Sequence, residues 1–537
     1  MPKSRTVPAF LAEQAATYGD SEALVGGSQR YTYRELRERV RSFAKGLMAL
    51  GIGKGSRVAI LLGNKAEWII ADLAICSLGG VMIAVNTWVT TRELAYVLGH
   101  SDADTLIFAG RFLKYDYAAM LGELEPHADS LPLLKRFIHV GAHGYRNSTP
   151  FDDVYRCGEV IDEAALVSLE TAVRPDDVAY VLYTSGSTAA PKGAQMQHYG
   201  LVENSWNIGN RMHVVPGDRV WLAVSLFWGL GCENAVFNLW THGGCVVLQE
   251  HFEAGEALRI IEKERCTIYY GMPHMAQAMY EHPDRRKRDL SSLRSGGTLG
   301  TPAQFQRLVE MGAKEICHIY GLTETFGNCN VSDGRLDPRA KVFATIGRPI
   351  DGVIQRIADP ETNLPLPVGQ IGEIQIKRHV TIGYYKDEEK TREAFTPDGF
   401  FRTGDFAFAD EDGFVHYRGR IKEMIKTGGL NVSPSEVEAI LLKQRGVKMA
   451  FVIGIPDATR DEIVGAVIVL EGKPDTDLRQ RLDAALKESV ASFKIPKVYT
   501  FVDEHALPLT TSGKVHKKEL VDLFTGEKGP SPSPAGA

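Results

Sequence analysis

A run of hydroxyl-bearing and small residues follows a short apolar segment in the first half of the chain. Residues 178–183 are aliphatic or aromatic, and residues 184–193 read Thr-Ser-Gly-Ser-Thr-Ala-Ala-Pro-Lys-Gly. Backbone N–H groups and hydroxyls in such a loop can surround phosphate oxygens, while Lys192 supplies a countercharge. The run lacks the Gly-Lys-Ser/Thr helix opening of a Walker loop. Phosphate binding is therefore one interpretation, and a flexible polar turn is the other.

Three later segments also combine glycine with polar groups. Residues 318–324 end in Tyr-Gly-Leu-Thr-Glu, and a carboxylate is a ligand that Mg²⁺ prefers. Residues 295–299 contain two glycines that let a backbone approach a flat group closely, although a tight turn would also use them. Residues 401–405 read Phe-Arg-Thr-Gly-Asp, and Asp405 could accept hydrogen bonds from a vicinal diol. A surface ion pair is the alternative for an isolated aspartate such as Asp405 or an isolated arginine such as Arg420.

Two segments near the C-terminus carry lysine and glycine. Residues 420–429 read Arg-Ile-Lys-Glu-Met-Ile-Lys-Thr-Gly-Gly, which also suits an exposed basic linker before a helix. Residues 509–515 read Leu-Thr-Thr-Ser-Gly-Lys-Val. Taken alone, Lys514 would be an ordinary solvated lysine. The order of all these segments along the chain is what makes each of them informative.

In this order the segments resemble the motifs of the adenylate-forming (AMP-binding) superfamily, which includes acyl-CoA synthetases, adenylation domains of peptide synthetases and luciferases. The resemblance covers nearly the whole chain and favours the branch of fatty-acid or aromatic-acid CoA ligases. One departure is Ala189, where the family usually has glycine. This difference leaves the affinity of the loop for ATP open.

The resemblance implies a site for ATP with Mg²⁺ as cofactor. Thr184 and Glu324 would hold the metal, and Lys514 would join them as the catalytic groups. Tyr320 would pack on adenine, and Asp405 with Arg420 would bind the ribose. The full implied ATP set is Thr184, Ser185, Gly186, Ser187, Thr188, Lys192, Gly297, Thr298, Leu299, Tyr320, Gly321, Thr323, Glu324, Asp405, Arg420 and Lys514.

The resemblance also implies a hinge and a path for the thiol. The C-terminal domain would turn about Lys422, withdrawing Lys514 and presenting Gly428 and Gly429 to the arm of CoA. A bulkier residue at either glycine would obstruct that arm.

The implied acid pocket is mostly apolar. Its members are Trp228, Gly229, Leu230, Gly296, Ile319, Thr325 and Phe326. Trp228 stands where many relatives have histidine, Gly229 is expected to make room, and Ile319 to take room away. The segment lacks the aspartate that pairs with the amine in amino-acid adenylation domains, so an amino acid is not the expected substrate. A medium-chain fatty, an alicyclic and an aromatic acid all stay open.

The function implied is ATP-dependent ligation of a carboxylic acid to CoA. The acid and ATP would give acyl-AMP and pyrophosphate, and acyl-AMP and CoA would then give acyl-CoA and AMP. Loading of a carrier protein instead of CoA is the main alternative. A luciferase-type oxygenase and a non-catalytic ATP-binding regulator are the others, and they differ in oxygen consumption and in AMP release.

Composition limits the partners and the setting. The 537 residues include 61 basic and 67 acidic side chains, which argues against nucleic acid or a membrane surface as the main partner. The seven cysteines contain no Cys-x-x-Cys pair and suggest neither a disulfide framework nor a zinc knuckle. No targeting segment is visible, so we expect a cytoplasmic protein. A homodimer is an open expectation.

Short aliphatic runs alternate with helix-length segments and predict an α/β fold with mostly parallel sheets. The runs expected to form strands are 58–62, 81–85, 105–108, 178–183, 220–224 and 245–248. Thr32 and Glu35 form a capping box for a helix that should stop at Gly51. Residues 68–85 are the most apolar stretch, but Asp72 and a Gly-Gly break favour a buried helix followed by a strand over a membrane span.

The pattern of apolar, glycine and proline residues changes at about residue 342. Short alternating segments such as 372–377, with frequent glycine and proline, predict a small barrel-like or antiparallel part over residues 342–419. We place the large N-terminal domain at 1–419 and a small mobile α+β domain at 420–525. The latter should contain a helix capped by Ser433, strands at 450–455 and 463–470, and a helix over 477–490 that carries Leu478, Leu482 and Leu486 four residues apart. Residues 526–537 are predicted to be disordered.

Overall fold

The chain forms two compact units in the computed structural model, which describes residues 1–124, 131–184, 191–427, 430–457, 461–472, 477–509 and 515–525. The first unit comprises Met1–Arg356, Gln375–Arg402 and Asp412–Val415. The second comprises Ile357–Ile374, Thr403–Glu411 and His416–Ala537. The division at residue 419 stays a prediction, and the tail from residue 526 lies outside the described residues.

A seven-stranded sheet in the first unit runs in the order β11-β10-β4-β3-β5-β8-β9. Its neighbours pair in parallel, except that β11 lies antiparallel to β10 at the edge. The strands are β3 (Arg57–Leu61), β4 (Val81–Ala84), β5 (Thr105–Ala109), β8 (Arg136–Val140), β9 (Thr149–Pro150), β10 (Val178–Thr184) and β11 (Lys192–Gln197). Strands buried on both faces read as continuous apolar runs, which is why β3, β4, β5 and β10 were predictable, whereas β8, β9 and β11 were not predicted.

The second sheet of this unit has nine strands in the order β18-β17-β16-β15-β14-β12-β13-β1-β2. Pairing is parallel from β16 through to β1 and antiparallel at both edges. The strands are β1 (Glu22–Gly26), β2 (Gln29–Thr32), β12 (Arg219–Leu222), β13 (Cys245–Leu248), β14 (Ile268–Tyr270), β15 (Ser295–Thr298), β16 (Glu315–Leu322), β17 (Gly327–Val331) and β18 (Arg348–Pro349). The predicted α/β fold with mostly parallel sheets is confirmed.

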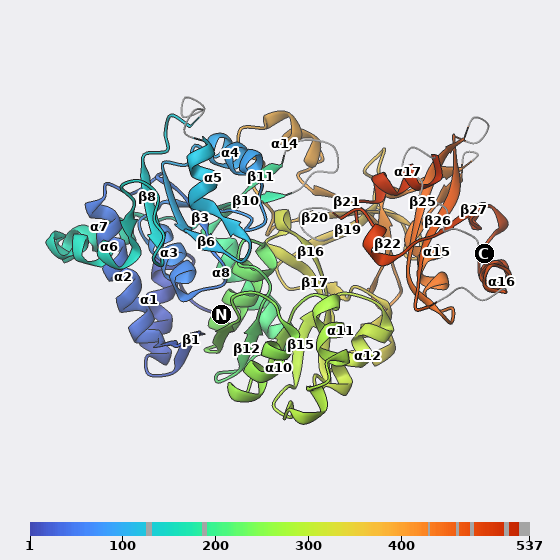
Figure 1. The fold of residues 1–537 in the computed structure, drawn as a ribbon, viewed down its shortest axis with the longest axis horizontal. Helices are drawn as coiled ribbons and strands as arrows, with labels where there is room; N and C mark the ends of the chain where they lie inside the picture. Colours follow the sequence, from blue (N-terminus) through green and yellow to red (C-terminus); the bar gives the residue numbers. More distant parts are fainter. Residues whose placement is uncertain are drawn as a thin grey trace, which may run out of the picture. The chain divides into compact units, whose positions relative to one another are not determined.

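Helices accompany both sheets (Figure 1). They are α1 (Val7–Tyr18), α2 (Tyr33–Ala49), α3 (Ala66–Ser77), α4 (Thr91–His100), α5 (Tyr117–Leu124), α6 (Phe151–Cys157), α7 (Glu163–Ala172), α8 (His198–Arg211), α9 (Val236–Trp240), α10 (Ala254–Lys263), α11 (Pro273–Glu281), α12 (Pro302–Glu310), α13 (Arg339–Ala344) and α14 (Glu388–Ala394). The capping box of Thr32 and Glu35 opens α2 as predicted.

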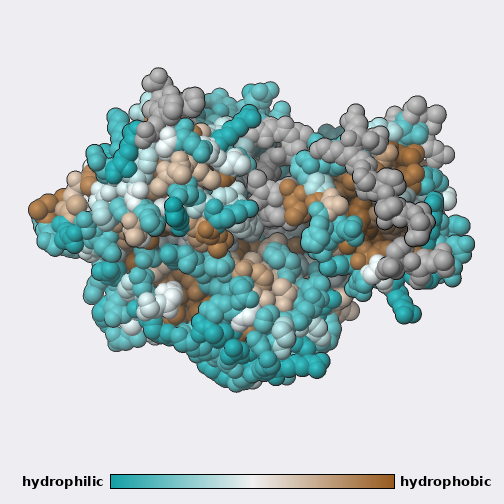
Figure 2. Space-filling view, in the orientation of Figure 1, coloured by the Kyte–Doolittle hydropathy of each residue, from teal (hydrophilic) through white to brown (hydrophobic). Residues whose placement is uncertain are grey.

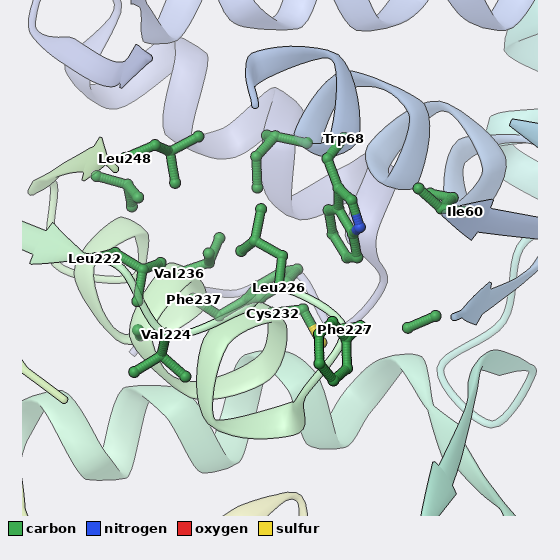
Figure 3. Close-up of a cluster of buried hydrophobic side chains, with 14 of the residues drawn as sticks. Ile60, Trp68, Leu222, Val224, Leu226, Phe227, Cys232, Val236, Phe237 and Leu248 are labelled. Carbon is green, nitrogen blue, oxygen red and sulfur yellow. The ribbon is translucent and has the colours of Figure 1, made fainter. Parts of the chain in front are cut away.

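The most apolar segment of the sequence is buried inside the first unit. It forms α3 followed by β4, and Trp68 in α3 is fully buried among the apolar side chains of Figure 3. No helix in the described ranges is both long and apolar enough to cross a membrane. The face of the molecule seen in Figure 2 is mostly hydrophilic, as burial of the apolar side chains requires.

Residues beyond 342 build two further sheets. One has four strands in the order β19-β20-β21-β22, with bounds Ile354–Ala358, Gly372–Lys377, Phe401–Ala409 and Val415–Arg420. The other runs β24-β23-β26-β25, with β27 added to β26. Its strands are β23 (Ile425–Thr427), β24 (Leu430–Val432), β25 (Val447–Asp457), β26 (Asp461–Leu470) and β27 (Val498–Phe501).

The helices of the second unit are α15 (Pro434–Leu441), α16 (Leu478–Ser489) and α17 (Asp522–Thr525). Leu478, Leu482 and Leu486 on α16 are buried in one apolar cluster, as their spacing predicted. Ser433 does stand at the start of α15, but the predicted side-chain cap is wrong. Its hydroxyl donates to the carbonyl oxygen of Arg418 instead.

Candidate functional site

The ends of β10 and β11 place Thr184 opposite Lys192. The two strands form an antiparallel pair in which these residues are partners. The sequence between the two strands contains Ser185, Gly186, Ser187, Thr188 and Ala189, which lie outside the described part of the chain. The structure thus brings together the first and last polar groups of the predicted phosphate loop.

The segment 381–385 packs against β11 and connects Lys192 to Glu324. The Tyr385 backbone N–H donates to the carbonyl oxygen of Gly193 at 2.8 Å. The ammonium of Lys192 lies 4.7 Å from the ring centroid of Tyr384, a cation–π distance. The hydroxyl of Tyr384 in turn donates to Oε1 of Glu324 at 2.9 Å. One tyrosine therefore contacts both a phosphate-loop cation and the predicted metal ligand.

Glu324 is buried and is held from two directions. It lies in a short 3₁₀ turn (Thr323–Thr325) after β16, and its backbone carbonyl accepts from the Thr381 N–H at 2.7 Å. Within the described residues only Tyr384 donates a hydrogen bond to its carboxylate. The other oxygen of the Glu324 carboxylate is suited to be a ligand of Mg²⁺.

No group of three or more His, Cys, Asp or Glu side chains gathers as a metal site in the described ranges. Mg²⁺ is commonly held by one or two carboxylates together with substrate phosphates, so a single carboxylate beside a phosphate loop fits that arrangement. Glu324 would be the carboxylate and Thr184 the hydroxyl in such a site.

The glycines of the predicted adenine side are required by packing within the sheet. A Cβ on Gly296 would collide with the carbonyl of Tyr269, and one on Gly297 would lie 2.8 Å from the ring of Tyr270. A Cβ on Gly321 would collide with the carbonyl of Gly327 across the β16–β17 pair. Residues 295–298 form a regular strand, so the tight-turn alternative is wrong.

The remaining members of the adenine set follow on the same strands. Thr298 donates to the carbonyl oxygen of Gly271 at 2.8 Å, and Leu299 after it is exposed. Tyr320 on β16 is half-buried, and Thr323 opens the turn that holds Glu324. The structure therefore places these predicted ATP residues on, or directly after, the adjacent strands β15 and β16.

Three aromatic rings meet at the predicted acid pocket. Trp228 lies edge-on to Trp88 at 5.5 Å and to Phe227 at 5.1 Å between ring centroids. Ile319, Thr325 and Phe326 are buried. Leu230 is half-buried and opens a π-helical turn, Leu230–Ala235. π-Helical turns are rare and often occur at functional sites.

This π-helical turn is fixed to the segment after Glu324. The Asn234 amide donates to the Phe326 carbonyl at 2.9 Å and accepts from the Asn328 N–H at 3.0 Å. Asn204 on α8 donates to the carbonyls of Phe326 and Asn328. Phe326 itself has φ of 52°, an unusual conformation for a bulky residue. The amides therefore support a strained turn between the predicted acid pocket and the predicted metal ligand.

The space beside Gly229 is occupied by a carboxyl group that the sequence analysis did not identify. A Cβ on Gly229 would collide with Oε2 of Glu233, four residues later in the π-helical turn. Glu233 is buried, and burial, with the negative charge of Glu324, raises its pKa well above the usual range. The expectation that Gly229 leaves open room for the acid is therefore corrected, and the site is less apolar than its named residues suggested.

The predicted ribose residues meet in the second unit. Asp405 on β21 is buried, and Nε of Arg420 lies 3.5 Å from its Oδ1. The hydroxyl of Tyr417 donates to the same oxygen at 3.4 Å. Burial, with the charge of Asp405, raises the pKa of Tyr417. Asp405 is thus buried, whereas 56% of the Arg420 side chain is exposed, and their role at the ribose stays a prediction.

The hinge and thiol-side predictions concern the same unit. Lys422 is exposed in a 3₁₀ turn, Ile421–Glu423, between β22 and β23. Gly428, Gly429 and Lys514 lie outside the described residues. Their roles in guiding CoA and in catalysis stay predictions.

Tyr384, Asn234 and Glu233 are site residues that sequence reasoning missed. Tyr384 lies 60 positions from its partner Glu324, and no local pattern announces such a contact. Glu233 carried a weak signal, because it is the only acidic residue between positions 219 and 249 and stands in an apolar stretch. Leu226, Phe227, Cys232, Val236 and Phe237 of that stretch are among the buried side chains in Figure 3.

Comparison with known families identifies both parts of the chain. Residues 11–385 match the family model "AMP-binding enzyme", and residues 436–514 match "AMP-binding enzyme C-terminal domain". The chain is 32% identical to the acyl-CoA ligase sidI of Aspergillus fumigatus, over 96% of this chain and 90% of the relative.

A second relative and a solved structure agree with these matches. The chain is 33% identical to 3-[(3aS,4S,7aS)-7a-methyl-1,5-dioxo-octahydro-1H-inden-4-yl]propanoyl:CoA ligase of Mycobacterium tuberculosis, over 97% of this chain and 99% of the relative. It superposes on the anthranilate CoA ligase AuaEII in complex with anthranoyl-AMP with a TM-score of 0.85, at 26% identity over 97% of each chain. The fold is thus mixed α/β with a large N-terminal and a small C-terminal domain. The chain therefore belongs to the adenylate-forming superfamily, in its acyl-CoA ligase branch, and is by class an AMP-forming acid–thiol ligase.

Proposed function

We propose that the protein converts a carboxylic acid and ATP into acyl-AMP and pyrophosphate, and then transfers the acyl group to CoA with release of AMP. The observation that carries this proposal is the convergence of Thr184, Lys192, Tyr384 and Glu324 in one unit. A cation and a carboxylate, linked by one tyrosine, suit a triphosphate with its metal ion.

Each residue has a role in the first step. The carboxylate oxygen of the acid attacks the α-phosphate, and the phosphate loop with Lys192 stabilises the charge that collects on the departing pyrophosphate. Mg²⁺, when bound, neutralises charge between the phosphates, and Glu324 would hold it with Thr184. Asp405 and Arg420 hold the ribose hydroxyls. No side-chain nucleophile is needed, because positioning and electrostatics carry such a step.

The second step needs the C-terminal domain to move. We propose that Lys514 assists adenylation, and that rotation about Lys422 then replaces it with Gly428 and Gly429 for thiol attack. A Lys514→Ala variant should lose adenylation by about a thousandfold, as expected for removal of a transition-state charge, and keep thiolysis of supplied acyl-AMP. Equal loss of both half-reactions in single turnovers would contradict the exchange.

The acceptor and the acid are part of the proposal. CoA is favoured as acceptor over a carrier protein because the compared relatives are named as CoA ligases. One of them is named for an alicyclic propanoyl group and one for an aromatic acid. A medium-chain fatty, alicyclic or aromatic acid is therefore proposed. We also propose a cytoplasmic location. We propose a homodimer as well, which analytical ultracentrifugation would test.

The test is a panel of these acids in the presence of MgATP, with pyrophosphate and AMP measured with and without CoA. The proposal predicts acid-dependent pyrophosphate release and acyl-CoA formation with CoA. Release of ADP, or nucleotide turnover independent of any acid, would contradict it. Acyl transfer to an acyl carrier protein but not to CoA would favour the carrier-loading alternative.

A further inference from the structure

Glu233 is a buried acid whose two carboxyl oxygens both lack hydrogen-bond partners among the described residues. The residue is 1% exposed. Both Oε1 and Oε2 are buried without a partner. A buried polar group without a hydrogen-bond partner destabilises the fold, so this arrangement is unfavourable unless another group pairs with the carboxyl. An unpartnered group of this kind indicates a ligand that completes it.

Glu233 follows Trp228, Gly229 and Leu230, three residues predicted to line the acid pocket, and lies in the π-helical turn that Leu230 opens. It folds back along its own turn onto Gly229, where any Cβ would collide with it. The same point is 3.7 Å from the side chain of Leu182 on β10, two residues before Thr184. Glu233 therefore lies where Gly229, the neighbour of the aromatic residue Trp228, meets Leu182 of the strand that ends at Thr184.

The surrounding structure fixes the backbone that carries Glu233. The hydroxyl of Ser205 donates to the Glu233 carbonyl at 3.1 Å. The neighbouring Asn234 is tied to Phe326 and Asn328. These contacts hold the turn that carries Glu233, so its carboxyl is preorganised for a partner that enters the site.

We propose that Glu233 is a specificity residue that recognises a hydroxyl group on the acyl portion of the substrate, so that the preferred acids are hydroxylated carboxylic acids. The inference rests on the proposed function, because it concerns the acid of that reaction. A hydroxyl both donates and accepts a hydrogen bond, so it can pair with the carboxyl whether Glu233 is neutral or ionised. A hydrocarbon chain would leave both oxygens unsatisfied, and an ammonium could only donate.

The experiment compares matched acids on matched variants. The acids are octanoic acid and its mono-hydroxylated isomers, with aminooctanoic acids as a third set. The proteins are the wild type, Glu233→Gln, Glu233→Leu and, as control, Glu203→Gln. Glu203 belongs to the same unit but contacts Arg5 and His379, and no role in the site is proposed for it. The readouts are kcat/KM for pyrophosphate release and the melting temperature.

The wild type should prefer one hydroxylated isomer over octanoic acid by about tenfold to a hundredfold, the range given by one hydrogen bond to a buried group. In Glu233→Leu the hydroxylated acid should lose this advantage in kcat/KM, while kcat/KM for octanoic acid stays the same or rises. Glu233→Gln should keep part of the ratio, because an amide also donates and accepts. Glu203→Gln should keep all of it.

Several outcomes would overturn the inference. These are an unchanged ratio in Glu233→Leu, an equal loss on both acids at an unchanged melting temperature, and a wild-type preference for the amino acids. If Glu233→Leu does not fold, an unchanged ratio in the isosteric Glu233→Gln overturns it equally. Absence of pyrophosphate release with every acid would instead refute the proposed function itself.

Discussion

Two buried carboxyl groups of the first unit differ in what the protein provides for them. Asp72 on α3 accepts from the Tyr180 hydroxyl at 2.8 Å and from the Cys76 thiol at 3.7 Å. Glu233 in the π-helical turn has no such donor among the described residues. Both are desolvated, and burial raises the pKa of each, to about 7 for Asp72. The chain thus satisfies one acid internally and leaves the other open.

The difference separates structural burial from burial for a ligand. Asp72 has hydrogen-bond partners from its own helix and from β10, so its role is complete within the fold. Glu233 needs a partner from outside, and it lies where the acid substrate is proposed to bind. Glu324 is intermediate, since Tyr384 occupies one oxygen and leaves the other for a metal ion. Substituting a carboxyl that has hydrogen-bond partners within the fold should lower stability. Substituting one that lacks such partners should change activity.

The largest effect is expected at Glu324. Glu324→Gln removes the charge that holds Mg²⁺ and should lower acid-dependent pyrophosphate release about 10²- to 10³-fold, the cost of losing a major electrostatic group. Pyrophosphate release as a function of Mg²⁺ concentration measures this. Glu310→Gln on the exposed face of α12 is the control. A Glu324→Gln enzyme with wild-type activity would remove this carboxylate from the metal site.

Asp72 should make stability depend on pH. Its pKa is about 7 in the folded protein against 3.8 for the exposed group, so the folded state binds more protons between these values. Stability should therefore fall as pH rises from about 4 to 7, by a few kcal/mol, and level off above that range.

Urea unfolding at pH 5 and pH 8 tests this prediction. Asp72→Asn cannot titrate, so the wild type should lose more stability than this variant between the two pH values. Activity per folded molecule should stay unchanged. Parallel pH dependences in the two proteins would show that Tyr180 and Cys76 hold Asp72 ionised throughout.

The amide of Asn234 should contribute to stability rather than chemistry. Asn234→Ala leaves the Asn328 N–H without its acceptor and loosens the turn at Phe326, which should cost about 2 kcal/mol of unfolding free energy. Asn210→Ala, which removes one hydrogen bond to His242 from an exposed position, should cost less than half as much. Equal losses would mean that the π-helical turn needs no such support.

The smallest effect is expected at Tyr384. Tyr384→Phe keeps the ring under Lys192 but removes the hydroxyl that orients Glu324. The loss of one positioning hydrogen bond should lower adenylation about tenfold and raise the Mg²⁺ concentration for half-maximal rate. A lower rate with an unchanged Mg²⁺ requirement would show that Tyr384 acts on something other than Glu324.

Local patterns predicted the elements well because the forces that form them are local. Cys245–Leu248 and Gly372–Lys377 are strands at the predicted bounds, and α16 buries the predicted leucines. The capping box of α2 was readable from two residues. The Ser433 cap failed because Arg418, 15 positions away, competes for the same hydroxyl.

The candidate site was predictable only as far as its motifs extend. Thr184, Lys192 and Glu324 belong to segments with a recognisable order, whereas Tyr384 and Asn234 act through contacts formed by the fold. Gly296 and Gly321 show a further limit, since close packing between strands explains them at least as well as a ligand. The burial of Glu233 could not be predicted, because a single acidic residue in an apolar stretch forms no periodic pattern that would indicate which groups surround it.

The central claim is that the acid itself attacks the α-phosphate of ATP. A preferred acid labelled with ¹⁸O in its carboxyl group tests this directly when AMP and the other products of one turnover with CoA are analysed by mass spectrometry. The account predicts one ¹⁸O atom in the phosphate of AMP and none in pyrophosphate. Label in inorganic phosphate, together with ADP, would contradict it.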